Sequence, residues 1–369
     1  MTSKSLPVNQ RQITYFHGFD PASTKRYRRI FEASAQRLNI SVQDLPNKGD
    51  GWRAVRGNTT TDLHIARYGD HVRRWQDLSM PARLGRGIRS LVGNLLDGSG
   101  FRIASVAPRA AVLALSPLLA TILPFALITR AIEPSGPIGI AFLLAIGLGL
   151  LVLAKHTFLL LVSDLFAFYR EIAGGTSTTF EAYRDRITEL SDEIPMEQTD
   201  ERLIVGHSMG GIAAILATSD ALERMPTDQP LGLITLGSNH GLILKQRGAG
   251  RDALAKATAR ITRDPRVFWL DVSSPHDAFC IPLTDPLLMI EPTADMQSPR
   301  VISAQLARAD KIPGDRRTVF AAMRRHMGYL LAPTQEGAFD YVDTVTGSKT
   351  LRQQFEARNN SPKAKMWRG

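Results

Sequence analysis

One serine in the sequence is placed where it could act as a nucleophile. Ser208 lies in the segment Gly206–Gly211, whose sequence GHSMGG fits the pattern G-x-S-x-G. Residues 201–205 indicate a short buried strand before this segment, and residues 212–217 indicate the Ala-rich start of a helix after it. That context is typical of a nucleophile elbow, a sharp turn that projects the hydroxyl while glycines prevent clashes between strand and helix. We therefore predict that Ser208 attacks a carbonyl carbon.

His326 is the residue that we expect to act as the general base. Only three of the eight histidines, His240, His276 and His326, follow Ser208 in the chain. Where such an elbow serves a catalytic triad, an acid and then the histidine follow the serine. His240 comes too early to follow an acid on the next strand, and His276 adjoins the candidate acids. His326 remains as the base, and a surface histidine in an Arg-rich turn is the alternative reading.

Two aspartates are candidates for the acid of this triad. Residues 267–270 indicate a strand, and Asp271 lies directly at its end. Asp277 lies on the loop that follows, where a carboxylate can reach the imidazole. We favour Asp277 and keep Asp271 as the alternative. The acid would fix the tautomer and orientation of His326, which takes the serine proton and later returns it to the leaving group.

Acyl transfer also needs two backbone N–H groups directed at the developing oxyanion. The residue after the nucleophile supplies one of them, which is Met209 here. Residues 12–16 indicate an early strand that runs into Gly18 and Phe19. Because glycine allows the backbone to approach a substrate closely, we expect Phe19 or Gly18 to supply the second donor. The alternative is a plain glycine turn.

These segments together resemble the α/β-hydrolase family of serine esterases and lipases. The resemblance rests on His17-Gly18-Phe19, on the elbow at 206–211, on the acid within residues 274–277 and on the late His326. It covers residues 1–70 and 165–335, approximately. It implies a mostly parallel, eight-stranded sheet with helices on both faces, and hydrolysis through an acyl-enzyme without a cofactor. The resemblance names no substrate, because one fold hosts many activities.

Two long apolar runs, 110–129 and 137–154, separate the two parts of the expected hydrolase. Each approaches the roughly 20 apolar residues that cross about 30 Å of hydrocarbon. The connection between them is short, so we predict a transmembrane helical hairpin. A re-entrant or monotopic hairpin, which Pro117 and Pro124 favour, and a soluble lid over the active site are the alternatives.

Charge near these runs predicts the orientation and the partners of the chain. Five arginines precede the first run, from Arg83 to Arg109, and Lys155 and Arg170 follow the second. Positive flanks favour the cytoplasmic side, so we expect the hydrolase domain there. The net charge of +10 suits contact with anionic lipid head groups. We expect no nucleic-acid partner, because the sequence lacks a recognition motif with interleaved aromatic residues, and no metal site.

The order of expected elements predicts the fold class and the domain boundaries. Expected strands at 12–16, 40–45 and 60–66 alternate with helices at 23–37 and around 71–78, and one helix is expected over 164–190 before the elbow strand. This alternation is typical of a doubly wound α/β fold. We divide the chain into hydrolase parts at 1–100 and 169–345, a hydrophobic hairpin at 101–168 and a C-terminal tail at 346–369.

The function expected from the sequence is that of a membrane-anchored serine hydrolase. Its substrate would be a carboxylic ester, and a lipidic or amphiphilic ester fits an enzyme held at a bilayer. Two other functions stay open. A catalytically inactive scaffold or binding protein would keep the fold without turnover, and an acyltransferase would pass the acyl group to an acceptor other than water.

Overall fold

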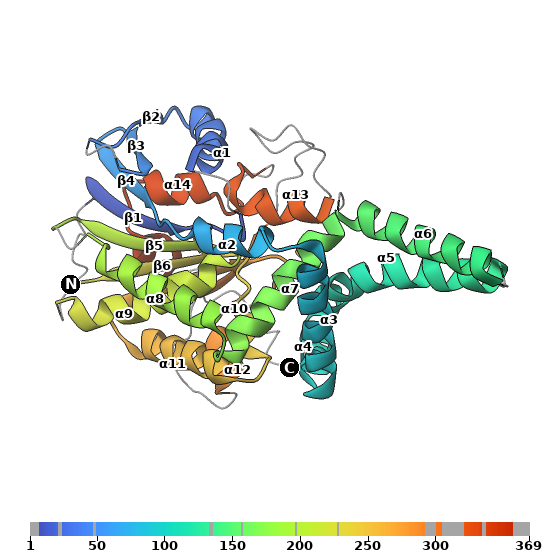
Figure 1. Ribbon diagram of the computed structural model, residues 1–369. Helices are drawn as coiled ribbons and strands as arrows, with labels where there is room; N and C mark the ends of the chain where they lie inside the picture. Colours follow the sequence, from blue (N-terminus) through green and yellow to red (C-terminus); the bar gives the residue numbers. More distant parts are fainter. Residues whose placement is uncertain are drawn as a thin grey trace.

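A single eight-stranded sheet forms the centre of the protein (Figure 1). The computed structural model describes residues 7–20, 24–46, 49–132, 136–155, 158–195, 198–226, 229–291, 300–304, 321–333 and 337–356. The strand order is β2-β3-β4-β1-β5-β6-β7-β8. The strands are β1 Gln10–Phe16, β2 Ser41–Gln43, β3 Gly51–Arg56, β4 Thr59–Ile65, β5 Glu201–His207, β6 Leu231–Leu236, β7 Val267–Ser273 and β8 Arg300–Ser303.

The sheet is mostly parallel, as expected. Only β3 runs against its neighbours, β2 and β4, whereas β4, β1, β5, β6, β7 and β8 pair in parallel. The first strand of the chain, β1, lies directly beside β5, and Phe16 pairs with Gly206. The loop that follows β1 therefore ends up next to the turn that follows β5. The protein is an α/β fold built on this sheet.

Helices cover both faces of the sheet (Figure 1). Because side chains alternate across a strand, Ile204 of β5 belongs to the hydrophobic core on one face, whereas Leu203 and Val205 belong to the core on the other. The helices of the body are α1 Thr24–Arg37, α2 Gly69–Gln76, α3 Met80–Leu96, α4 Ser99–Val106, α7 Phe158–Gly174, α8 Thr178–Asp192, α9 Gly210–Arg224, α10 His240–Leu244, α11 Ala249–Arg263, α12 Pro286–Ile290, α13 Ala321–Met327, α14 Tyr341–Thr346 and α15 Leu351–Phe355, with a 3-10 turn η1 at Gly328–Leu330.

The two apolar runs form helices α5 (Pro108–Ile132) and α6 (Gly136–Lys155), which project side by side from the body as a hairpin (Figure 1). Their positions match the expected runs 110–129 and 137–154, and residues 133–135 of the connection lie outside the described residues. Within the described part of the chain, no helix meets the length and apolarity needed to cross a membrane. The expected transmembrane pair is therefore not found there.

The segment before the elbow strand differs from the single helix that we expected over 164–190. It consists of α7 and α8, separated by a break at Gly175. Gly175 has φ +70°, and a Cβ on this residue would lie 2.1 Å from the backbone nitrogen of Gly250. Only glycine fits this left-handed, crowded position, so the Gly174-Gly175 pair ends the first helix.

Strand β3 and helix α15 are among the elements that were missing from the expected pattern. Strand β3 buries Trp52 and Ala54 on one side, which is the alternation of a strand with one covered face. Helix α15 lies in the region that we assigned to the tail, yet Leu351 and Phe355 are buried in the core. Residues 346–356 are thus part of the folded body, and residues 357–369 lie outside the described part.

The buried side chain of Arg11 ties this C-terminal segment to the sheet. Its guanidinium donates to Glu201 at 2.6 Å and to three carbonyl oxygens that precede α15, those of Val345, Gly347 and Lys349, at 2.7, 2.9 and 2.9 Å. Glu201 also accepts a hydrogen bond from the backbone N–H of Leu351 at 2.5 Å. The Arg11–Glu201 ion pair therefore satisfies hydrogen-bonding groups from β1, β5 and the segment around α15.

We predict that Arg11→Met lowers the free energy of unfolding by about 3–5 kcal/mol, because it leaves the Glu201 carboxylate buried without its counter-charge. The matched control is Arg53→Met, since Arg53 pairs with Asp62 in the same sheet but both side chains are partly exposed. Loss of that pair should cost about 0–1 kcal/mol. Urea denaturation of both variants checks this difference, and equal destabilisation would contradict it.

Candidate active site

Ser208 lies in a strained turn between β5 and α9. Its backbone φ is +59°, a left-handed conformation that non-glycine residues seldom adopt. The N–H of Ser208 donates to the carbonyl of Leu236 at 2.9 Å, which fastens the turn to β6. A Cβ on Gly206 would lie 2.4 Å from the carbonyl oxygen of Gly210, and one on Gly210 would lie 2.0 Å from that of Phe16. The two glycines therefore let strand, turn and helix approach closely.

His326 and Asp277 are in direct contact. Nδ1 of His326 lies 2.8 Å from Oδ2 of Asp277, and both side chains are buried. Asp277 follows β7 on a loop, and His326 lies near the end of helix α13 rather than on a loop. The structure thus joins these two candidate residues, although 49 residues separate them in the chain.

The carboxylate of Asp277 is held by further hydrogen bonds. The Tyr329 hydroxyl donates to Oδ2 at 3.0 Å, and the N–H of Phe279 donates to Oδ1 at 2.9 Å. Burial alone would raise the pKa of Asp277, but the charge and hydrogen bond of His326, together with these two donors, hold the pKa below its usual value. Asp277 is therefore an ionised acceptor that fixes the ring of His326.

Asp271, the alternative acid, has a different environment. It lies within β7 and accepts a hydrogen bond from the Thr235 hydroxyl at 2.5 Å, which in turn accepts one from Trp269 at 2.9 Å. Burial raises the pKa of Asp271 to about 7. No hydrogen bond between Asp271 and His326 occurs among the described residues. The geometry therefore favours Asp277 as the partner of His326.

The hydroxyl of Ser208 donates to the side-chain oxygen of Asn239 at 3.1 Å. Asn239 follows β6, and its amide nitrogen donates to the carbonyl of Phe279, whose ring lies 4.8 Å from that of His326. Nε2 of His326 is buried and has no hydrogen-bond partner among the described residues. Proton transfer from Ser208 to His326 would thus require the hydroxyl to leave Asn239.

His207, inside the elbow motif, contacts the backbone of His326. Its Nε2 lies 3.1 Å from the carbonyl oxygen of His326, so this nitrogen carries the proton and donates. The two imidazole rings lie 5.0 Å apart. Burial, followed by the neighbouring His326, lowers the pKa of His207 to about 3, so His207 stays neutral. It fixes the backbone of His326 without adding a positive charge.

The two candidates for the second oxyanion donor, Gly18 and Phe19, have different surroundings. The N–H of Gly18 donates to the Tyr27 hydroxyl at 3.3 Å, so this donor is already occupied. A Cβ on Gly18 would lie 3.0 Å from Cβ of Ser208, which places this loop directly against the nucleophile. Phe19 is the next residue, and its ring packs 5.3 Å from Phe168 of α7. Phe19 is thus the candidate whose N–H is not engaged by Tyr27, and Met209 lies at the N-terminal end of α9.

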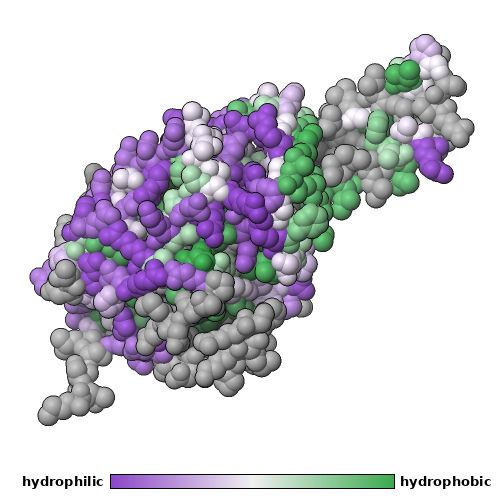
Figure 2. Space-filling model, turned by 90° about the horizontal axis from the view of Figure 1, so that it is seen from below, coloured by the Kyte–Doolittle hydropathy of each residue, from purple (hydrophilic) through white to green (hydrophobic). Residues whose placement is uncertain are grey.

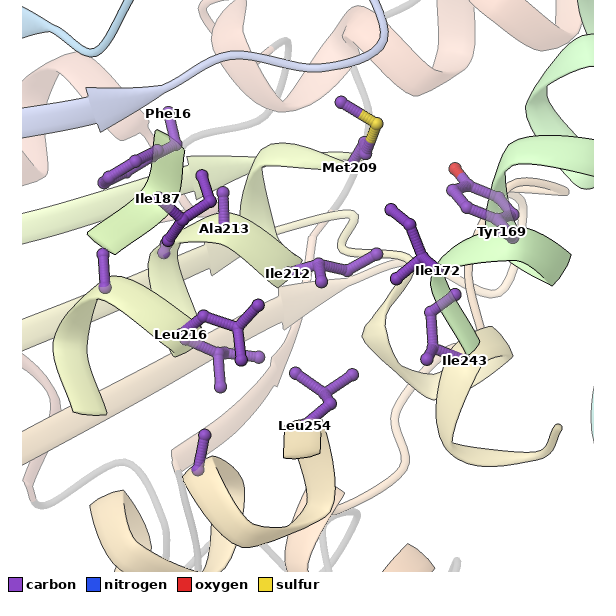
Figure 3. Close-up of a cluster of buried hydrophobic side chains, with 14 of the residues drawn as sticks. Phe16, Tyr169, Ile172, Ile187, Met209, Ile212, Ala213, Leu216, Ile243 and Leu254 are labelled. Carbon is purple, nitrogen blue, oxygen red and sulfur yellow. The ribbon is translucent and has the colours of Figure 1, made fainter. Parts of the chain in front are cut away.

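Tyr169 is a further polar residue at this site. It projects from α7 into the buried cluster that also contains Met209 (Figure 3). Its hydroxyl is buried and has no hydrogen-bond partner among the described residues. Burial, and then the negative charge of Asp277, raise the pKa of Tyr169 well above its usual value, whereas an interaction with Ser208 works in the opposite direction. The Tyr169 hydroxyl is thus protonated and interacts with Ser208.

Sequence reasoning missed four residues of this site: Tyr169, His207, Asn239 and Tyr329. His207 stands inside the elbow motif, and Asn239 follows the end of a recognisable strand, so weak signals for these two existed. Tyr169 and Tyr329 belong to apolar helical segments, where a tyrosine resembles any other core residue. Only their three-dimensional positions reveal them.

The site is closed in this structure. Ser208 is 5% exposed and His326 is 3% exposed. A polar surface pocket lies beside α14 and α15, lined by residues that include Asp340, Lys349 and Phe355, and it contains none of the candidate catalytic residues. Among the residues that the structure describes, no group of three or more His, Cys, Asp or Glu side chains could hold a metal ion.

Comparisons with known proteins give no relative on which to base a function. No family model, no curated protein and no solved structure matches the chain. The function must therefore be argued from the geometry of the site.

The raised pKa of Asp271 gives a prediction about stability and pH. Because the pKa in the folded state is about 7 and the ordinary value is 3.8, the unfolded chain loses this proton first as the pH rises. The stability that the protonated group contributes is complete below pH 4 and is lost as the pH rises to 7, by up to about 4 kcal/mol.

We therefore expect the free energy of unfolding of wild type to fall relative to that of Asp271→Asn as the pH rises from 4 to 7. Urea denaturation at several pH values measures this difference. A difference that does not change with pH would show that Asp271 is ionised in the folded protein.

Proposed function

We propose that this protein is a serine hydrolase of the α/β-hydrolase family that cleaves a carboxylic ester. The observation that carries the proposal is the combination of Ser208 in a left-handed elbow with the buried Asp277–His326 hydrogen bond of 2.8 Å. A strained serine turn costs of order 1–3 kcal/mol, and such strain collects at functional sites. The parallel sheet, with the acid after β7 and the histidine after β8, supports the same family.

In the first step, the Ser208 oxygen attacks the ester carbonyl and His326 takes the serine proton at Nε2. Asp277 accepts the hydrogen bond from Nδ1 and stabilises the imidazolium that forms. The tetrahedral intermediate then collapses: the bond to the alcohol breaks, and His326 gives its proton to the leaving alkoxide. The products of this half-reaction are the free alcohol and an acyl-enzyme on Ser208.

In the second step, a water molecule attacks the acyl-enzyme while His326 removes its proton. The acid leaves, and the proton returns to the Ser208 oxygen. Both tetrahedral intermediates carry a negative oxygen, which the amides of Met209 and Phe19 would stabilise. The Tyr169 hydroxyl, close to Ser208 and without another partner among the described residues, is a third donor for this oxygen.

The surroundings of the site support an apolar acyl group. Phe279 lies against His326, Phe19 lies beside Phe168, and Met209 belongs to a large buried core. Helices α5 and α6 also present exposed apolar side chains, among them Leu127 and Phe142. We therefore propose a lipidic or amphiphilic ester as substrate and a location at a membrane, with the hydrolase body on the cytoplasmic face.

A second candidate function is that of an inactive binding or scaffold protein with the same fold. One observation favours this function: the Ser208 hydroxyl donates its hydrogen bond to Asn239 and not to His326. Catalytic hydrogen bonds are often long or misaligned without substrate, so this contact does not exclude turnover. The two functions differ in whether the protein turns over an ester.

We predict that the purified protein hydrolyses p-nitrophenyl esters and that Ser208→Ala and Asp277→Asn each lower kcat by about 10³- to 10⁴-fold or more. Asp271→Asn is the matched control, because it makes the same change at a second buried aspartate of the same region. Steady-state kinetics should give this control a kcat within a few-fold of wild type. A wild type without turnover of short and long acyl esters would favour the scaffold function.

Tyr169→Phe tests the third donor. Removal of one oxyanion donor typically lowers kcat by about 10²- to 10³-fold and leaves KM almost unchanged. The control is Tyr183→Phe, since Tyr183 is also buried in this core and its hydroxyl likewise lacks a partner among the described residues. Equal kcat values for the two variants would remove Tyr169 from the oxyanion site.

A further inference from the structure

Helix α3 is amphipathic, but its polar and apolar sides face in the opposite directions to those of a surface helix in a water-soluble protein. Its polar side faces the protein: Arg83 pairs with the buried Asp164 of α7, and the Ser90 hydroxyl donates to the carbonyl of Phe166 at 3.2 Å. A surface helix normally turns its apolar stripe towards the core. Apolar side chains of α3 lie instead on its outer side, where Ile88, Val92 and Leu96 are exposed.

The outward stripe of α3 continues onto α4 and forms one surface, here called the docking face. Its residues are separated by three or four positions along α3, which is the spacing of one side of a helix. The docking face consists of exposed Ile88, Val92, Leu95, Leu96, Phe101 and Val106. Leu96 is 84% exposed and Phe101 is 70% exposed, so these side chains have no cover in the isolated chain.

Large exposed apolar side chains are confined to one region of the described structure. In the described part of the chain, all of them lie between residues 88 and 142, on α3, α4, α5 and α6. Figure 2 shows apolar surface gathered where the body meets the projecting hairpin, whereas most of the other coloured surface of the body is polar. Figure 1 shows α3 and α4 running across the base of the hairpin. The docking face thus continues into the apolar helices α5 and α6.

The charge around the docking face is positive. Arg89 and Arg109 are exposed beside it, and no acidic residue is exposed between residues 80 and 112. Asp97, the acidic residue of this segment, is paired with Arg170 of α7. An apolar stripe with basic residues at its border suits a lipid surface that carries anionic head groups.

We propose that the docking face lies in the interface of an anionic lipid bilayer, with α3 and α4 along the membrane surface at the base of the hairpin. This inference rests on one part of the proposed function, the location of the hairpin at a membrane. A bilayer covers the docking face and the hairpin helices as one continuous apolar surface. A second copy of the chain is the other occupant that the chemistry allows. It would have to cover both the docking face and the hairpin helices.

Two contacts beside the docking face join its helices to elements of the active site. Helix α3 packs on α7, the helix that carries Tyr169, through the Arg83–Asp164 pair. Arg109, at the start of α5, donates to the carbonyl of Pro275, two residues before Asp277. Docking of this face therefore acts on elements that carry residues of the active site, which suits an ester that resides in the same membrane.

The test places an environment-sensitive nitrobenzoxadiazole dye on Leu96→Cys of the full chain. The one cysteine of wild type, Cys280, is buried, so wild type is the labelling blank. The matched control is Ala33→Cys on an exposed position of α1, away from the docking face. Phe101→Cys is the second variant if Leu96→Cys fails to fold, as judged by thermal unfolding.

With vesicles of phosphatidylcholine and phosphatidylglycerol, the dye at residue 96 should shift to the blue, brighten several-fold and lose its quenching by iodide. The dye at residue 33 should not change. With phosphatidylcholine alone, binding should be about tenfold weaker, because each near-surface basic residue contributes to attraction by anionic lipid.

Three results would overturn the proposal. The first is a dye at residue 96 that stays accessible to iodide on membrane-bound protein. The second is equal binding to both vesicle types. The third is shielding of residue 96 in the absence of lipid together with a doubled molecular mass, which would identify a second copy as the occupant. These readouts need no ester turnover, so a failure of the enzymatic function would leave them intact and would be seen separately.

Discussion

The left-handed backbone at Ser208 is the constraint around which the site is built. A residue in this conformation turns the chain sharply, so helix α9 can begin directly after strand β5. The turn is kept in place because Gly206 and Gly210 leave room for the neighbouring backbone. The parallel pairing of β1 with β5 then brings the Gly18 loop against the same serine. Strain at one residue is thus held by contacts from three strands.

The positions of Asp277 and His326 depend on a buried polar network. Asp277 is held by donors from Tyr329 and Phe279, and the backbone of His326 is held by His207. Each of these groups is buried, and an unpaired buried polar group costs about 1–3 kcal/mol. The network therefore fixes the geometry of the pair. It leaves Nε2 of His326 as the nitrogen without a partner among the described residues, which is where a base must accept a proton.

Much of this arrangement could be predicted from the sequence. The elbow, the buried strands and the two apolar runs carry strong local patterns, and the described residues form an α/β fold with a mostly parallel sheet of eight strands. From the sequence, Asp277 could only be favoured over Asp271 as the acid of the triad. Two aspartates near one strand end cannot be distinguished until their burial and hydrogen-bond partners are known. The break at Gly175 and the inverted polarity of α3 depend on tertiary contacts, which no local pattern contains.

The central claim is that Ser208 is a nucleophile activated by His326. The most direct measurement is reaction of the protein with a fluorophosphonate, followed by mass spectrometry of the intact chain and of its peptides. The account predicts one phosphonyl group per chain, attached to Ser208, and no adduct in His326→Ala. A folded protein that forms no adduct, or one attached to another residue, would contradict the account.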